Sequence, residues 1–196
     1  MTDQLSIRVT SQRNGLIALG SNLAYHDTPP KEILAQSLDL LEGMGLEVAA
    51  VSALYRTPAF PAGSGPDFVN AAARCETNLS PGDVLRALHD TETRFGRSRQ
   101  ARWAARALDI DLLAYGDMIV PDRATFESWR DLPHDRQQKE APGGLVLPHP
   151  RMHERGFVLV PLADVAPTWR HPVIGKSVTE MLAALPKSET EGIQRL

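Results

Sequence analysis

The order of strand and helix patterns along the chain is the feature that most limits its possible folds. Strand patterns, with alternating or continuous apolar residues, occur at residues 15–22, 47–55, 68–77 and 108–114. Helix patterns, with apolar residues three and four positions apart, follow the first strand at about 29–42 and the third at about 81–95. The predicted order is therefore strand, helix, strand, strand, helix, strand.

Residues typical of helix starts precede both helices. Asp27 or Thr28 can cap the first helix ahead of Pro29 or Pro30. The second helix begins more distinctly at residues 80–83, where a hydroxyl cap precedes a proline and an acidic residue. This element order favours an α+β, ferredoxin-like βαββαβ sandwich with helices on one face of an antiparallel sheet. The other face is then free to build a site, and additional C-terminal strand and helix elements complete the chain.

The composition is that of an ordinary globular protein, with 42% apolar and 23% charged residues among 196. This length suits one domain spanning 1–196, with a polar loop insertion at 121–144 and a short helix near 124–129. No apolar run is long enough for a membrane span and no signal-like start is present, so we expect a cytoplasmic protein. The single cysteine, Cys75, excludes an internal disulfide and is expected to be buried and unreactive.

Charge is distributed unevenly. The formal net charge of −3 gives no reason to expect a nucleic acid or a membrane as partner; the oligomeric state stays open, with a monomer favoured. Residues 93–108, however, hold no acidic residue and five arginines: Arg94, Arg97, Arg99, Arg102 and Arg106. Guanidinium groups bind phosphate oxygens, and the small residues between them indicate a segment that can close over a polyphosphate. A basic surface loop is the alternative interpretation.

Two aspartates follow this arginine segment. Asp109 and Asp111 are two positions apart on a predicted strand, so their carboxylates project from one face about 7 Å apart. Leu108, Ile110 and Leu112 project from the opposite face. Mg²⁺ takes one or two carboxylates and completes its shell with water and phosphate oxygens. The pair is a candidate magnesium site, although a solvated strand face would show the same spacing.

A third polar cluster lies at residues 147–157, where His149 and Arg155 are suited to contact phosphate. The tripeptide Gly175-Lys176-Ser177 resembles the end of a phosphate-binding P-loop. The glycine that such a loop requires five residues earlier is Arg170, so we exclude that motif.

Several short motifs, in order between residues 16 and 172, resemble one enzyme family. They are Leu19-Gly20-Ser21-Asn22-Leu23, Tyr55-Arg56-Thr57-Pro58, Asp67-Phe68-Val69-Asn70-Ala71, Gly96-Arg97, Arg102-Trp103, Arg106-Ala107-Leu108-Asp109-Ile110-Asp111, Pro148-His149-Pro150-Arg151 and Arg155-Gly156-Phe157. Together they resemble the 6-hydroxymethyl-7,8-dihydropterin pyrophosphokinases. The resemblance implies transfer of pyrophosphate from ATP to the hydroxymethyl oxygen of the pterin, with release of AMP, in folate biosynthesis.

The resemblance also implies a role for each matching residue. Asp109 and Asp111 would hold two Mg²⁺ ions, and Arg97 and Arg106 would be catalytic. The residues implied to bind ATP are Glu92, Arg99, Arg102, Leu112, His149 and Arg155. The residues implied to bind the pterin are Gly20, Asn22, Thr57, Phe60, Phe68, Asn70, Trp103 and Phe157. Strand alternation independently places Phe68 and Asn70 on one face, as a flat ring that needs both stacking and an amide partner would require.

Two other functional classes share parts of this pattern. An RNA-binding module has the same element order, but its sheet face would carry paired aromatic residues and positive charge, where this chain has Asp109 and Asp111. A different Mg²⁺-dependent nucleotidyl or phosphotransferase on the same core is the second alternative.

Overall fold

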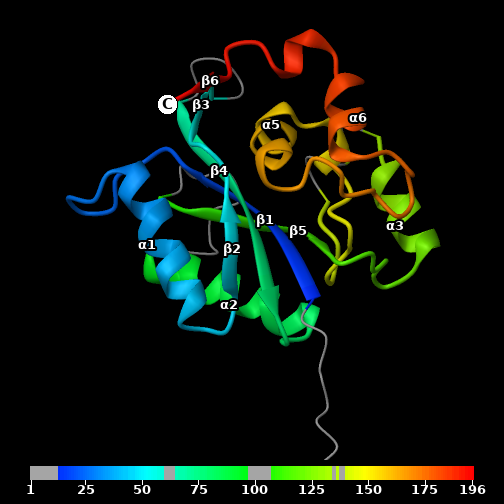
Figure 1. Cartoon of the computed structure of the whole chain (residues 1–196), viewed down its shortest axis with the longest axis horizontal. Helices are drawn as coiled ribbons and strands as arrows, with labels where there is room; N and C mark the ends of the chain where they lie inside the picture. The colour runs from blue at the N-terminus through cyan, green and yellow to red at the C-terminus, as the bar shows by residue number, and fades with distance from the viewer. Residues whose placement is uncertain (1–12, 60–64, 97–106, 134–135, 137–139) are drawn as a thin grey trace, which may run out of the picture.

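The computed structural model describes residues 13–59, 65–96, 107–133, 136 and 140–196. Within these residues the chain forms an antiparallel six-stranded sheet in the order β5-β1-β4-β3-β6, and β2 pairs with a later part of β4 (Figure 1). The strands are β1 Arg13–Ser21, β2 Glu47–Val51, β3 Tyr55–Thr57, β4 Phe68–Thr77, β5 Asp109–Tyr115 and β6 Gln194–Arg195. The α+β sandwich predicted from the element order is confirmed.

The helices of the described chain are α1 Pro30–Glu42, α2 Pro81–Arg94, α3 Arg123–Arg130, α5 Gly156–Val165 and α6 Val178–Ala183. Two 3₁₀ turns, η1 Met152–Glu154 and η2 Lys187–Glu189, connect the C-terminal elements. The short helix expected in the insertion is present as α3, which begins where the Asp122 carboxylate accepts a hydrogen bond from Thr125 N–H at 2.8 Å. None of these helices is long and apolar enough to cross a membrane.

The starts of the two predicted helices differ in outcome. α2 begins as expected, with Ser80 Oγ accepting a hydrogen bond from Asp83 N–H at 3.2 Å. The expected side-chain cap of α1 is wrong, because Pro29 is the N-cap residue and makes no capping side-chain bond. Thr28 instead exchanges two backbone hydrogen bonds with Tyr25, each of 3.0 Å, so its place is in the preceding turn.

The strand predicted at 47–55 is broken into β2 and β3. Ser52 N–H donates to Ala72 O, and Ala72 N–H donates to Ser52 Oγ, both at 2.9 Å. A side-chain hydroxyl thus replaces a backbone carbonyl in the ladder. The Ala53 N–H then turns away from the sheet to donate to Asp164 at 3.1 Å, so β3 restarts at Tyr55 with its own register on β4.

Two apolar cores hold the sheet between its helices. α1 and α2 pack on one face through Leu34 and Leu88, against strand residues that include Ile17 and Ala73. Cys75 belongs to this core, which confirms its expected burial, and burial raises the pKa of its thiol to about 12. A stripe of small and large apolar residues is therefore shared by β1, β4 and β5 on that face.

The second sheet face is not left free, contrary to the sequence-based expectation. α5 packs on it, and α6 packs against α5 (Figure 1). The second core lies here and includes Leu159 and Leu162 of α5 with Leu16, Ala72 and Leu113 of the strands. These strand residues are apolar and need a partner layer. A site on this face is confined to the part beyond α5.

Candidate active site

A row of three residues crosses the sheet at the end that α5 leaves uncovered. Gly20 on β1 is opposite Asn70 on β4 and, on its other side, opposite Asp109 on β5. A Cβ atom on Gly20 would lie 2.7 Å from Asn70 Oδ1 and 3.7 Å from Phe68 Cδ1. Such a contact is too close for any side chain, so glycine at this position lets an amide and an aromatic ring approach the β1 backbone.

The Asn70 amide has a fixed orientation. Its Nδ2 donates to Thr57 Oγ1 at 2.7 Å, and both side chains are buried. Phe68 is two residues away on the same strand and is partly exposed, whereas Ala71 and Ala73 on the other strand face are in the α1–α2 core. The predicted alternation of Phe68 and Asn70 is confirmed. An aromatic ring and an oriented amide therefore share this face.

Asn22 follows β1 and contributes a second amide. Its Nδ2 donates to Pro66 O at 3.2 Å, while its Oδ1 is buried and has no hydrogen-bond partner among the described residues. A buried acceptor without a partner costs about 1–3 kcal/mol. A ligand donor at this position would remove that cost.

The two carboxylates of β5 lie beside the amides. Asp109 is next to Gly20, and Asp111 is next to Ala18, while Ile110 between them is buried in the α1–α2 core. Both aspartates are partly exposed, and Arg155 Nη1 lies 4.0 Å from Asp111 Oδ2. Burial lowers the pKa of Arg155, and the nearby Asp111 carboxylate partly opposes that effect.

This donor set fits a divalent cation of the Mg²⁺ type. Two hard carboxylates on one strand face leave room for phosphate and water oxygens, as that ion requires. No group of three or more histidine, cysteine, aspartate or glutamate side chains in the described part of the chain could hold a metal ion. A pair of carboxylates on one strand face suits an ion that shares its coordination shell with a substrate.

His149 lies along the outer edge of β5. Its backbone N–H donates to Leu113 O at 2.7 Å, and its ring Nδ1 accepts from the backbone N–H of Arg151 at 3.1 Å. Burial, together with the charges of Arg155 and Arg151, lowers the pKa of His149 to about 3. The ring is therefore neutral at physiological pH, with its proton on Nε2, because Nδ1 is an acceptor.

Comparison with known proteins identifies the enzyme class. The family model of 7,8-dihydro-6-hydroxymethylpterin-pyrophosphokinase matches residues 16–167. The 2-amino-4-hydroxy-6-hydroxymethyldihydropteridine pyrophosphokinase of Pseudomonas aeruginosa is 40% identical over 181 residues, which are 92% of this chain and 94% of that protein. The chain belongs to this pyrophosphokinase family.

Other relatives agree with the assignment to the pyrophosphokinases. The enzyme of the same name from Methylorubrum extorquens is 35% identical over 91% of this chain and 97% of its own length. Among solved structures, Plasmodium falciparum HPPK-DHPS with pteroate superposes with a TM-score of 0.67 at 13% identity. That match covers 94% of this chain but 48% of the longer one, and at this identity it shows the fold alone.

Two further residues expected at the pyrophosphokinase nucleotide site have defined places. Glu92 on α2 is buried, and its Oε1 accepts from Ile110 N–H at 2.8 Å, so it links α2 to β5. Leu112 is buried with its side chain in the α1–α2 core, and it lies on the edge strand between Ile110 and Leu113. Nucleotide contacts of both residues stay predictions.

Phe157 lies in the first turn of α5 and is 41% exposed, with the Arg155 guanidinium carbon 5.7 Å from its ring centroid. The remaining predicted residues of the pyrophosphokinase site lie outside the described residues. They are Phe60, Arg97, Arg99, Arg102, Trp103 and Arg106.

Sequence reasoning missed one polar contact next to the site. Tyr55 on β3 donates its hydroxyl to Asp164 Oδ2 at 2.9 Å, and the same oxygen accepts from Ala53 N–H. Burial and this hydrogen bond raise the pKa of Tyr55. Two signals could have shown the contact: Tyr55 shares a strand face with Thr57, and Asp164 is the only charged residue in the sequence of α5.

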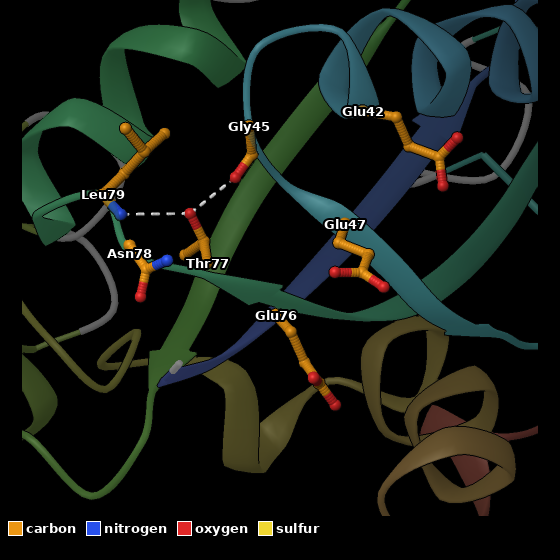
Figure 2. Close-up of a pocket in the computed structure, with 7 residues that line it drawn as sticks. All are labelled: Glu42, Gly45, Glu47, Glu76, Thr77, Asn78 and Leu79. Atoms are coloured by element: carbon orange, nitrogen blue, oxygen red, sulfur yellow. Dashed lines mark hydrogen bonds between the residues drawn. The ribbon is translucent and has the colours of Figure 1, made fainter. Parts of the chain in front are cut away.

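The cavity drawn in Figure 2 is separate from the site. Its volume is about 550 Å³, and it lies at the far end of β4, where Thr77 Oγ1 joins Gly45 O to Leu79 N–H. Three glutamates, Glu42, Glu47 and Glu76, line its other side. None of the residues predicted for the pyrophosphokinase site lines this cavity.

Proposed function

We propose that this pyrophosphokinase transfers the terminal pyrophosphate of ATP to the hydroxymethyl oxygen of 6-hydroxymethyl-7,8-dihydropterin, in the region around Gly20. The new bond joins that oxygen to the β-phosphorus, and the hydroxyl proton is released to solvent. The bond between the β-phosphorus and the bridging oxygen breaks, so AMP leaves with the oxygen that bridged the α- and β-phosphates. The observation that carries the proposal is the row Asn70, Gly20 and Asp109 on three adjacent strands. It brings groups suited to a heterocycle next to groups suited to a metal-bound polyphosphate.

The pterin end of the site would use the amide side of this row. Asn70 is held by Thr57, so its free amide groups are oriented before the substrate binds. Asn22 Oδ1 would accept a hydrogen bond from the ring, which gives the buried acceptor a partner. Phe68 would stack on the ring, and Gly20 leaves its backbone accessible. Phe60, Trp103 and Phe157 would complete this part of the site.

The phosphate end would use the carboxylates and the cations. Asp109 and Asp111 would hold two Mg²⁺ ions, which when bound neutralise phosphate charge and align the reacting groups. Arg155 lies beside Asp111 and would bind phosphate oxygens. The neutral His149 would donate from Nε2 to the nucleotide, which avoids the cost of a buried imidazolium.

The remaining roles follow the family resemblance. Arg97 and Arg106 would stabilise the charge that develops as AMP leaves, with Arg99 and Arg102 as further phosphate ligands. Glu92 and Leu112 would contact the nucleotide along the β5 edge. We also propose that the enzyme works as a monomer in the cytoplasm, where ATP and reduced thiols such as Cys75 are found.

The deciding experiment is to incubate the purified protein with ATP, Mg²⁺ and 6-hydroxymethyl-7,8-dihydropterin and to separate the nucleotides. AMP should appear in equal amount to the pterin diphosphate. Omission of the pterin is the control for ATP hydrolysis. Formation of ADP, or of AMP without the pterin, would disprove the proposed reaction.

A further inference from the structure

The last ten residues of the chain form a strap across the edge of the candidate site. This strap, residues 187–196, begins with η2 and continues through the turn in which Ile193 N–H donates to Thr190 O. It ends as β6, where Gln194 pairs with Arg56, Arg195 pairs with Tyr55, and Leu196 N–H donates to Leu54 O at 2.9 Å. The family model ends at residue 167, so the strap lies beyond the part of the chain that the model matches.

Thr57, at the end of β3, and Pro58 after it form one side of the site, called here the β3 wall. The strap contacts this wall at Pro58. Gly192 has a φ of +78°, and a Cβ atom there would lie 2.9 Å from Pro58 Cγ. The proline ring is rigid and cannot rotate away from such an atom. Pro58 directly follows Thr57, whose hydroxyl orients the Asn70 amide. The strap thus touches the residue next to the proposed pterin contacts.

Residues 155–157, at the start of α5, form another side of the site, called here the α5 wall. The same strap contacts this wall at Gly156. A Cβ atom on Gly156 would overlap the carbonyl oxygen and carbon of Glu189, so the backbones meet directly. Gly156 is the first residue of α5 and lies between Arg155 and Phe157. Arg155 is the residue beside Asp111. The strap therefore joins the β3 wall to the start of α5.

A second link joins the same two elements. Asp164, near the end of α5, accepts from Tyr55 and from Ala53 in the segment that leads into β3. This contact fixes one end of α5 to β3. The strap fixes the other end, where the proposed ATP and pterin residues are found.

We propose that the strap is a positioning element, which sets the separation between Thr57–Pro58 and Arg155–Phe157 and thereby the fit of the pterin. The inference rests on the proposed function of those two walls. No strap residue needs to touch substrate. A shift of about 1 Å in one wall is enough to weaken an oriented contact strongly.

The test compares two glycines that share a backbone conformation. Gly192→Ala and Gly175→Ala each place a side chain at positive φ, of +78° and +75°, but the Gly175 position has no atom within 4 Å. Both variants carry the same kind of backbone strain. Gly192→Ala alone should displace Pro58. We expect it to raise the KM for the pterin about fivefold with kcat within twofold, while Gly175→Ala leaves both unchanged.

A double variant tests whether the effect acts through Pro58. Pro58→Ala removes the ring atoms that the new methyl group would meet, so Pro58→Ala/Gly192→Ala should return the pterin KM close to that of Pro58→Ala alone. Pterin binding measured by fluorescence, without turnover, should show the same order. A chain ending at Gly192, which lacks β6, should also bind pterin more weakly at little cost in kcat.

The outcomes separate the two proposals. If the wild-type protein forms no AMP, the proposed function fails. If it forms AMP but Gly192→Ala and Gly175→Ala have equal pterin KM and dissociation constants, the strap has no positioning role. If the two glycine variants lose equal thermal stability but differ in the KM for the pterin, the positioning role of the strap is supported.

Discussion

Gly20 is a residue of the candidate site that leaves no room for a side chain. We predict that Gly20→Ala weakens pterin binding by at least about tenfold, because its Cβ would lie 2.7 Å from Asn70 Oδ1 and must displace the amide. Gly15→Ala is the matched control on the same strand, since its Cβ would meet no atom closer than 3.9 Å. Pterin titration by fluorescence measures both. Equal pterin affinities in the two variants would show that Asn70 does not take part in pterin binding.

The carboxylates give a second prediction at the residue scale. Asp109→Ala or Asp111→Ala should lower kcat by at least about 100-fold with little loss of stability, because neither side chain belongs to a described apolar core. Asp117→Ala, in the exposed turn after β5, is the control and should stay fully active. Rates at saturating Mg²⁺ and thermal melts test this. Near-normal turnover of both site variants would show that the metal assignment is wrong.

Elements with strong local signals were predictable from the sequence, and contacts between distant elements were not. β4 was predicted at its observed bounds because its alternation is clear, and α2 because Ser80 caps it. The break after β2 depends on a hydrogen bond from Ala72 to Ser52, which no local pattern reveals. The short apolar run in α5 has no periodicity that would separate helix from strand, so its packing on the second face was missed.

Glu92 belongs to the scale of elements, because its carboxylate joins α2 to the edge strand β5. We predict that Glu92→Ala lowers the free energy of unfolding by about 1–3 kcal/mol, since Ile110 N–H loses its partner. Glu92→Gln keeps an acceptor oxygen and should cost much less. Urea denaturation of the two variants separates them. If Glu92→Gln instead keeps full stability and loses ATP affinity, the residue also binds nucleotide.

At the scale of the whole molecule, the insertion and the C-terminal part meet around one buried histidine. His171 is fully buried between the rings of Phe126 on α3 and Trp169, at centroid distances of 5.3 and 5.8 Å. Its Nδ1 accepts from Val173 and Ile174 N–H, each at 3.2 Å. The segment predicted as a loop insertion is therefore anchored to residues that follow the family match. Sequence spacing alone could not show this, because the two segments are 45 residues apart.

The lowered pKa of His171 leads us to predict how the stability of the fold depends on pH. Burial lowers the pKa of His171 to about 4, aided by the nearby His153 and Arg130, whereas the unfolded chain titrates near 6.5. Between these values the unfolded state binds more protons than the native state, so stability falls as the pH is lowered from about 6.5 to 4, by up to about 1.4 kcal/mol per unit.

His171→Asn keeps an acceptor in place of Nδ1 but cannot titrate. The variant should therefore be less stable than the wild type at pH 7, because it packs less well. Its free energy of unfolding, measured by urea denaturation at pH 7, 5.5 and 4.5, should fall less steeply with decreasing pH than that of the wild type. Parallel declines in wild type and variant would mean that other groups control the acid sensitivity.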